Sequence, residues 1–367
     1  MTTGAGTKTR GRLSALVAAA LVVLTYLAVT EVVLRFLPVA TGLHSVAVND
    51  MQPIFDFEPN RDFVYSRGWN LRDVVHGRVN NAGWVNEQDY TREGKLPLVA
   101  VIGDSYIEAQ MVPYAETLQG RLAAELKGRA RVYSFAASGA TLSEFAVYAA
   151  YAVREFGAAA VVINMANYDF AGSDAAYNRP SGMWVYDGAG DDKRLRLIPY
   201  RPGWLREIVQ RSALARYLLL NLHLDRPLIA AHLIASLAPT RAAVAAEPDN
   251  ATRLAASAAV IPLFFRDFAH LVGRPPDRVL FVMDGVRYPG SSDDDYTDRL
   301  RQSFRGAAQA SGYETVDLEP LFLARYRQQA TIFEIPGDPH WNGEGHGVAA
   351  EGVMSSRLIA DLLAQSR

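Results

Sequence analysis

A serine stands directly after a short apolar run in LPLVAVIGDS, residues 96 to 105. Such a run, bounded by a proline and a Gly-Asp-Ser turn, is typical of a buried parallel strand. The carboxyl ends of these strands carry the chemistry of α/β folds. The hydroxyl of Ser105 is therefore expected above the sheet, beside backbone N–H groups that could stabilise an oxyanion. Gly-Asp-Ser is also an ordinary turn and helix cap, so the serine alone decides nothing.

A candidate base lies near the carboxyl end, in IPGDPHWNGEGHGVAAEGV. Asp338 and His340 share a loop bounded by proline and glycine, and Asp338 follows Ser105 by 233 residues (338 minus 105). A carboxylate two residues from a histidine can hold one ring nitrogen, which leaves the other nitrogen free to take a proton from a serine. A helix-capping aspartate and a surface histidine would give the same pattern.

The same loop offers a possible metal site. Asp338, His340, Glu344 and His346 fall within nine residues, and such donors suit zinc or manganese. No further ligand pair is evident, and the alternating glycines from Gly343 onward suggest a turn leading into a helix. We therefore expect neither a metal nor another cofactor, and a metal-dependent hydrolase using Asp338, His340 and His346 stays an alternative.

Two further residues could help to bind an oxyanion. Gly139, in AASGAT, has no side chain to keep a ligand from its backbone N–H. Asn167, in INMANYDF, carries a side-chain amide that could donate. Each follows a predicted strand, as Ser105 does, and the carboxyl ends of parallel strands meet at one edge of a sheet.

Strands and helices alternate along most of the chain. This rhythm predicts an α/β fold with a parallel sheet covered on both faces. The predicted strands are residues 96–105, 131–138, 158–166, 278–285 and 313–318, and the predicted helices are 115–127, 143–156, 296–311 and 346–365. The rhythm breaks at about 179–276, where we predict a helical insertion that forms a lid or side wall or lies on a membrane surface.

The amino-terminal region reads as a membrane anchor. Residues 13 to 30 carry no charge, and the apolar character continues to about residue 37, a length that suits one transmembrane helix over 13–37. Basic residues within 1–12 predict a cytoplasmic tail, which places the remainder in the periplasm or another extracytoplasmic space. A cleaved signal peptide is the rival interpretation. We expect a neck and lead-in at 38–95 and the main domain at 96–367.

The amino-acid composition excludes several classes of protein and of functional site. The 367 residues are 50% hydrophobic with a formal charge of -2, which argues for a globular domain and against nucleic-acid binding. The absence of cysteine excludes disulfides, zinc-thiolate sites, iron–sulfur clusters and cysteine nucleophiles.

From residue 96 to about 362 the sequence resembles the SGNH (GDSL-type) hydrolase family, most specifically in its GDS and DPHWN blocks. The resemblance implies a three-layer α/β/α, flavodoxin-like domain. It also implies acyl-ester chemistry through an acyl-serine at Ser105, with His340 as base and Asp338 as its orienter. The implied oxyanion hole consists of the Ser105 and Gly139 N–H groups and the Asn167 side chain.

The chain departs from the family pattern in two blocks. The family's Gly-x-Asn-Asp is here Met165-Ala166-Asn167-Tyr168, which leaves Asn164 as a substitute donor. The common Asp-x-x-His is here Asp338-Pro339-His340. A similar Asp-x-His-Trp occurs in membrane-anchored SGNH-like proteins that acetylate exported polysaccharides.

The expected function is a serine esterase or O-acyltransferase that acts on an acylated small molecule or, more specifically, a polysaccharide of the cell envelope. The anchor adds the membrane as a partner and leaves room for a membrane partner that donates the acyl group. The alternative is a non-catalytic SGNH-like module that binds glycans or organises a membrane complex.

Overall fold

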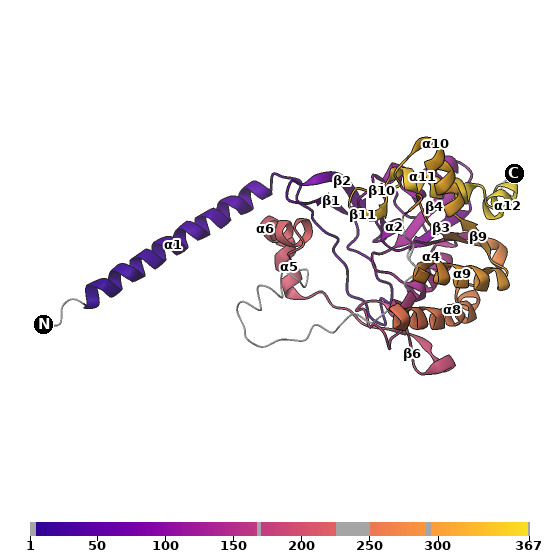
Figure 1. Cartoon of the computed structure of the whole chain (residues 1–367), viewed down its shortest axis with the longest axis horizontal. Helices are drawn as coiled ribbons and strands as arrows, with labels where there is room; N and C mark the ends of the chain where they lie inside the picture. The colour runs from indigo at the N-terminus through magenta and orange to yellow at the C-terminus, as the bar shows by residue number, and fades with distance from the viewer. Residues whose placement is uncertain (1–4, 167–169, 225–249, 291–294, 366–367) are drawn as a thin grey trace. The chain divides into compact units, whose positions relative to one another are not determined.

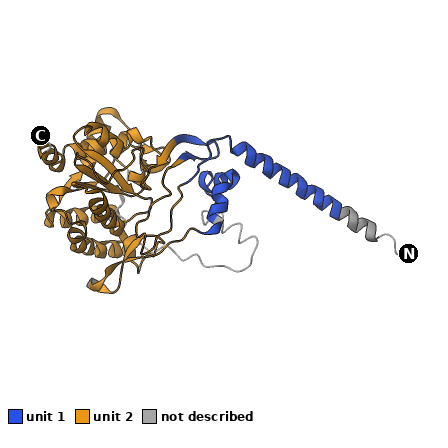
Figure 2. Cartoon of the chain, turned by 180° about the vertical axis from the view of Figure 1, so that it is seen from behind, with its two compact units in different colours: residues 1–42, 63–75, 203–243 blue, residues 43–62, 76–202, 244–367 orange. Residues whose placement is uncertain are grey.

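The computed structural model describes residues 5–166, 170–224, 250–290 and 295–365. The chain forms two compact units (Figure 2). Unit 1 comprises residues 1–42, 63–75 and 203–243, and unit 2 comprises 43–62, 76–202 and 244–367. Unit 2 holds the sheet and all of the candidate catalytic residues, whereas unit 1 holds the apolar amino-terminal helix.

The centre of unit 2 is a sheet of five parallel strands in the order β4-β3-β5-β8-β9 (Figure 1). The strands are β3 (Leu98–Gly103), β4 (Arg131–Ala136), β5 (Ala160–Met165), β8 (Val279–Met283) and β9 (Glu314–Asp317). The three central strands β3, β5 and β8 are almost entirely apolar because both faces of the sheet are buried there. The chain pairs β4 and β5 on opposite sides of β3, so its direction of winding reverses at the carboxyl end of β3.

Helices cover both faces of the sheet. One layer packs on the core that contains Ile102 and Phe281, and the other packs on the core that contains Val101 and Val282. The first layer consists of α4 (Leu142–Phe156), α8 (Asn250–Val272) and α9 (Asp295–Ala310). The second consists of α2 (Ser105–Glu108), α3 (Leu118–Glu125), α10 (Glu319–Gln329), α11 (Gly343–Met354) and α12 (Arg357–Gln365). The predicted α/β class with three layers is therefore confirmed.

Two predicted helices are each divided into two elements, and the lead-in contains strands that were not predicted. The predicted helix 115–127 is a short 3₁₀ turn, η1 (Tyr114–Glu116), followed by α3. The predicted helix 346–365 is α11 and α12, with a break between them. The lead-in contains two strands, β1 (Arg61–Arg67) and β2 (Arg72–Val79), which form a separate two-stranded sheet.

The segment 179–276 contributes to both units. Within unit 2 it forms the antiparallel pair β6 (Trp184–Asp187) and β7 (Arg194–Leu197), and also α8. Although α8 is long and apolar enough to cross a membrane, it buries Phe264 and Phe268 in the core under the sheet. The remaining short elements are η2 (Phe170–Ser173), η3 (Gly190–Asp192), η5 (Pro276–Arg278) and, in unit 1, α5 (Trp204–Arg211), α6 (Ala213–Arg216) and the π-helical turn η4 (Tyr217–Asn221).

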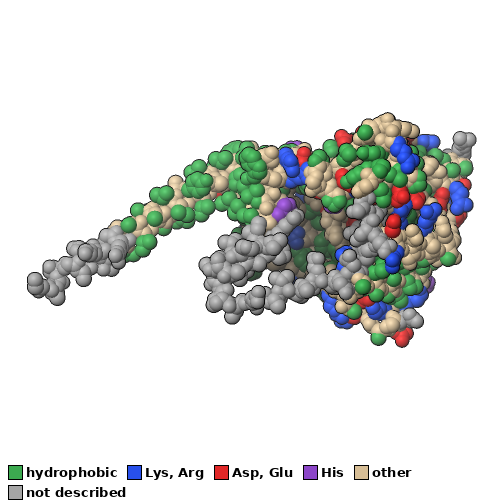
Figure 3. Space-filling view, viewed as in Figure 1, with side chains coloured by type: hydrophobic (Ala, Val, Ile, Leu, Met, Phe, Trp, Pro, Cys, Tyr) green, Lys and Arg blue, Asp and Glu red, His purple; other side chains and the backbone are tan. Residues whose placement is uncertain are grey.

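Unit 1 begins with the long helix α1 (Ala5–Leu34). Hydrophobic side chains run along its described surface (Figure 3). No residue from 13 to 33 is buried, whereas Leu34 is buried in a small cluster with Val39 and Ala213. The helix therefore starts before the predicted span 13–37 and ends three residues earlier, where turns lead to Pro38. By length and composition, Leu13–Leu34 is a candidate membrane span.

Candidate active site

Ser105 is the first residue of α2, immediately beyond β3. The Asp104 carboxylate caps this helix by accepting a hydrogen bond from the Tyr106 amide, 3.0 Å away. Gly103 lets α2 pack directly on the end of the strand, because a Cβ at this position would lie 2.4 Å from Ile107 Cγ1. The short helix therefore holds the Ser105 hydroxyl at the point where the sheet reverses its winding.

His340 and Asp338 belong to β11 (Asp338–Trp341), which pairs antiparallel with β10 (Glu334–Ile335). Pro336 and Gly337 form the turn between these strands, and Gly337 has a φ of +77°, which glycine adopts without strain. Residues two apart in an extended strand point to the same side. This geometry explains why the tight Asp338-Pro339-His340 spacing still brings the two side chains together.

The three candidate catalytic side chains are linked by hydrogen bonds. His340 Nε2 lies 2.7 Å from Ser105 Oγ, and His340 Nδ1 lies 2.5 Å from Asp338 Oδ1. These residues form a Ser–His–Asp triad. About a fifth of the side-chain surface of Asp338 (22%) and of His340 (23%) is exposed, and Ser105 is half-buried, so the triad can be reached from solvent. The proximity expected from the sequence is observed.

A buried ion cluster lies behind the catalytic strand. The Arg287 guanidinium donates to the Pro339 carbonyl at 2.7 Å and to Asp284 at 2.5 Å and Glu334 at 2.6 Å. The Tyr106 hydroxyl donates to the same Pro339 carbonyl at 2.9 Å. The residue between Asp338 and His340 is therefore held by two donors. This cluster was not predicted from the sequence, although Asp284 lies at the end of the predicted strand 278–285, at the same sheet edge.

Two backbone amides, those of Ser105 and Gly139, lie just beyond the carboxyl ends of β3 and β4. Within the described chain, neither the Ser105 N–H nor the Gly139 N–H donates a hydrogen bond. Glu108 fixes the loop before Gly139, since its carboxylate accepts from the Ser138 amide at 2.8 Å and from the Ser138 hydroxyl at 2.7 Å. These amides suit the first two oxyanion donors expected from the sequence.

The third expected oxyanion donor, Asn167, lies outside the described residues. Its substitute, Asn164, is fully buried on β5, beside the end of β3. Neither Oδ1 nor Nδ2 of Asn164 has a hydrogen-bond partner among the described residues. Burying an unpaired amide costs free energy. Asn164 therefore stays a candidate for the third oxyanion donor.

Two buried carboxyl groups lie close to the triad. Burial raises the pKa of Asp104 to about 6 and also raises the pKa of Glu108, while His340 lowers the pKa of both.

The second histidine of the block, His346, has a structural role. It is buried in α11, and its Nδ1 accepts a hydrogen bond from the Leu118 amide at 3.1 Å. Burial lowers its pKa to about 3, so the ring is neutral. Trp341 is also fully buried and donates to Asp284. In the described part of the chain, no group of three or more His, Asp or Glu side chains is arranged to hold a metal ion.

Comparisons with known proteins give only distant similarities. No protein-family model matches the chain, and no curated protein does. A member of the lipolytic G-D-S-L family from Veillonella parvula aligns with 10% identity over 71% of this chain and 97% of its own, with a TM-score of 0.35. The acetyl-xylooligosaccharide esterase Axe2 from Geobacillus aligns with 11% identity over 72% and 95%, with a TM-score of 0.37.

The acetyl xylan esterase AlAXEase gives similar values, with 13% identity over 70% of this chain and 98% of its own and a TM-score of 0.37. Similarities at this level do not carry a functional argument. The assignment of the site therefore rests on its own hydrogen bonds and on the sheet edge where they lie.

Proposed function

We propose that this protein is a serine-dependent acyl-ester hydrolase of the SGNH type. The observation that carries the proposal is the continuous hydrogen-bonded chain from Ser105 Oγ through His340 to Asp338. In this arrangement the histidine accepts the serine proton while the carboxylate holds the ring and stabilises the imidazolium.

The reaction would proceed in two stages. Ser105 Oγ attacks the ester carbonyl carbon, and its proton moves to His340 Nε2. The tetrahedral oxyanion accepts hydrogen bonds from the Ser105 and Gly139 amides. When this intermediate collapses, the alcohol leaves with the proton from His340, and the acyl group remains on Ser105.

The second stage frees the enzyme. His340 takes a proton from an attacking water as the water oxygen bonds to the acyl carbon, and the proton returns to Ser105 Oγ as the acid leaves. A sugar hydroxyl in place of water would give an O-acyl transfer with the same proton movements. The chemistry of the triad is thus common to an esterase and an acyltransferase.

The proposed setting is the outer side of a membrane, with α1 as an uncleaved anchor and an acylated carbohydrate as substrate. The anchor is supported by the 22-residue apolar stretch Leu13–Leu34 and by the basic residues before it. The carbohydrate is supported by the Asp-x-His-Trp block, which is similar to that of SGNH-like proteins that acetylate exported polysaccharides.

A fluorophosphonate probe tests the nucleophile directly. The full chain in detergent should be labelled and should hydrolyse p-nitrophenyl acetate, and Ser105→Ala should lose both properties. The exposed serine of α9 supplies a matched control, since Ser303→Ala should retain both. If the unmodified protein is neither labelled nor active, the non-catalytic glycan-binding module becomes the better assignment.

An acceptor experiment separates the two reactions. With an acyl donor and an oligosaccharide present together, a hydrolase releases free acid at an unchanged rate, whereas a transferase forms acylated oligosaccharide. The orientation can be measured separately because the chain has no cysteine. A membrane-impermeant maleimide applied from outside to spheroplasts should label Lys127→Cys and spare Thr9→Cys.

A further inference from the structure

Unit 1 exposes several large apolar side chains close to the carboxyl end of α1. Phe36 is 85% exposed, Trp69 77%, Trp204 69% and Ile208 55%. Trp204 and Ile208 are four residues apart in α5 and so lie on one side of that helix, whereas Arg206 lies on the opposite side. These four apolar residues are called here the apolar rim.

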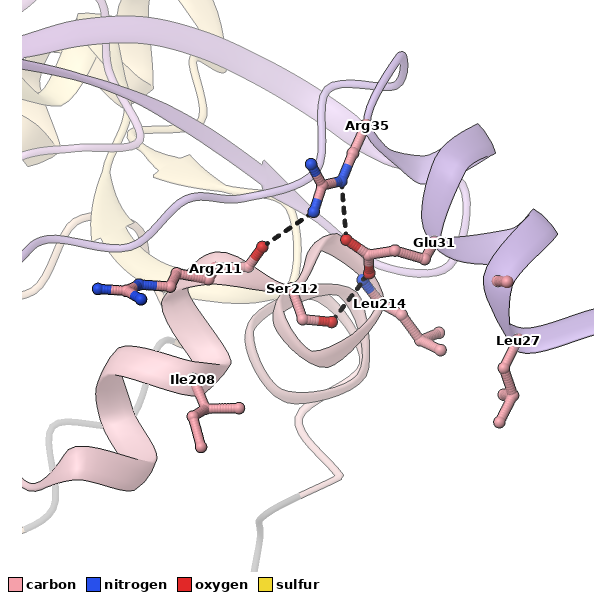
Figure 4. A pocket seen from close by; sticks show the side chains of 8 residues that line it. Leu27, Glu31, Arg35, Ile208, Arg211, Ser212 and Leu214 are labelled. Atoms are coloured by element: carbon pink, nitrogen blue, oxygen red, sulfur yellow. Dashed lines mark hydrogen bonds and ion pairs between the residues drawn. The ribbon is translucent and has the colours of Figure 1, made fainter. Parts of the chain in front are cut away.

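Hydrogen bonds attach α5 and α6 firmly to the end of α1. The Glu31 carboxylate accepts from the Ser212 hydroxyl at 2.9 Å and from the amides of Ala213 and Leu214 at 3.0 and 2.9 Å. Arg35 donates to Glu31 and to the carbonyl of Arg211 (Figure 4). The first turn of α6 is therefore capped by a side chain of α1, and this fixes α5 at the level of the last turns of the apolar helix.

The loop that carries Trp69 is attached to the same place. The Tyr217 hydroxyl donates to the Trp69 carbonyl at 2.8 Å, and the Asn221 amide donates to the Ser66 carbonyl at 3.0 Å. Asn221 also accepts from the Ala40 amide at 3.1 Å. The segments that carry Trp69, Trp204 and Ile208 are thus all held by hydrogen bonds around the carboxyl end of α1.

A hollow of about 520 Å³ opens between α1 and the α5–α6 pair (Figure 4). Leu27 and Ala28 line it from α1, and Ile208 and Leu214 line it from α5 and α6. Its polar lining comes from Glu31, Arg35, Arg211 and Ser212, and Glu31 pairs with Arg35. An apolar hollow with two arginines in its lining suits an acyl chain that continues into an anionic headgroup.

Arginines outnumber acidic residues in this part of unit 1. In the described part of unit 1 beyond residue 30, the arginines are Arg35, Arg67, Arg72, Arg206, Arg211 and Arg216, and the acidic residues are Glu31, Asp73 and Glu207. Aromatic side chains together with arginine are typical of protein segments that lie at the membrane–water interface.

We infer that the apolar rim docks into the lipid interface of the bilayer that α1 crosses, with a lipid acyl chain in the hollow. This inference rests on the proposed membrane span. If Leu34 ends the span, its hydrogen-bonded neighbours α5 and α6 lie at the depth of the lipid headgroups. The apolar side chains then leave water, and this burial favours docking.

Spin labels in the full chain, reconstituted in phosphatidylethanolamine–phosphatidylglycerol vesicles, test the inference. Since the chain has no cysteine, a single label can be placed through Ile208→Cys on the apolar side of α5 or through Arg206→Cys on its other side. We expect the label at 208 to collide more with oxygen, which concentrates in lipid, and the label at 206 to collide more with a water-soluble nickel complex.

Two results would overturn the inference. Equal access of the nickel complex to both labels would place α5 in water, and exclusion of both reagents from 208 would place it against protein, as in a second copy of the chain. A label through Leu21→Cys reports on the anchor separately. If 21 is lipid-exposed while 208 is not, the span stands and only the docking fails; if 21 is water-exposed, both fail.

Native tryptophan fluorescence gives an independent measurement. Brominated phospholipids quench tryptophans only at close range, and none of the five tryptophans lies in α1. We expect quenching of the full chain to fall when Trp69 and Trp204 are both replaced by phenylalanine, and to persist in Trp184→Phe of unit 2. Quenching that is unchanged in the double variant would contradict docking.

Discussion

At the scale of single residues, two members of the triad lie only two positions apart in the sequence. Asp338 and His340 are next-nearest neighbours on one strand, so the pleat of the backbone alone directs both side chains to the same side. Asp338 Oδ1 also accepts from the His340 backbone amide at 3.0 Å, which restrains the carboxylate further. The orientation of the base is therefore fixed locally, before any contact with Ser105.

The two histidines of the block should respond differently to substitution. His340→Gln removes the base, and we expect kcat/KM for p-nitrophenyl acetate to fall by about three orders of magnitude or more. His346→Gln removes only a buried acceptor for the Leu118 amide, so the thermal midpoint should fall while kcat changes little. A loss of activity in His346→Gln comparable to that in His340→Gln, with the fold intact, would contradict this division.

Arg287 is expected to act as a positioning residue. Arg287→Met removes one of the two donors to the Pro339 carbonyl and leaves Asp284 buried without its cation, which should cost about 3–5 kcal/mol of stability. A displacement of about 1 Å in the triad can lower kcat by about a hundredfold. We expect kcat to fall more than KM rises, and Arg287→Lys to restore part of the activity.

If Arg287 has a purely structural role, we expect a different result for the Met variant. In that case the Met variant would lose stability, but its folded fraction would keep the kcat and the pH–rate profile of the unmodified protein. Burst titration of active sites with the fluorophosphonate probe gives the folded, competent fraction needed for this comparison.

The candidate catalytic residues could be predicted from the sequence, and the residues that hold them in position could not. Ser105 and His340 follow recognisable breaks after strands or turns. Arg287 pairs with groups from three separate segments, and ion pairs of this kind leave no periodic trace in a sequence. The Glu108–Ser138 contact was missed for the same reason.

At the scale of elements, the contact of α2 with β3 decides where Ser105 lies. Gly103→Ala would place a methyl group 2.4 Å from Ile107 Cγ1 and 2.9 Å from its Cβ. We expect α2 to move outward, which lengthens the Ser105–His340 distance and lowers kcat about a hundredfold. Overpacking should also cost about 1–3 kcal/mol of stability.

Gly306→Ala is the matched control for this substitution. Gly306 lies inside α9, and a Cβ there meets nothing within 4 Å. The change should leave kcat unaltered and stabilise the protein by about 0.5–1 kcal/mol, since alanine favours helix more than glycine does. Urea unfolding of both variants would show whether the two effects have opposite signs.

Long apolar elements could be predicted from the sequence, and short or polar ones could not. The buried strands β3, β5 and β8 are short, almost entirely apolar runs, because helices cover both faces of the sheet. By contrast, β10 and β11 have two and four residues and take their pairing from a turn. The sequence of α10, EPLFLARYRQQ, has no clear apolar face, and its place against the core comes from Phe322 and the sheet around it.

At the scale of the whole molecule, a buried carboxyl group makes stability depend on pH. Glu144 is fully buried in α4, and burial raises its pKa from 4.5 to about 8. Between these values the unfolded chain releases the proton and the folded protein keeps it. The free energy of unfolding should therefore decrease as pH rises from about 4.5 to about 8, with a slope of about 1.4 kcal/mol per pH unit.

Glu144→Gln isolates this contribution. The glutamine cannot ionise and can still accept from the Trp184 amide, so the thermal midpoint should fall less between pH 5.5 and pH 8.5 than in the unmodified protein. The exposed Glu125→Gln should show the unmodified slope. An equal slope in all three proteins would mean that Glu144 titrates alike in the folded and unfolded chains.

The placement of Asp338 and His340 on one four-residue strand makes two of the three triad members a single transferable part. The hairpin carries its own base, its own orienter and the turn that sets their register. Grafting the machinery onto another parallel sheet would then require the distance to a serine at the end of a strand, and donors that hold the middle residue of the hairpin as Arg287 and Tyr106 do here.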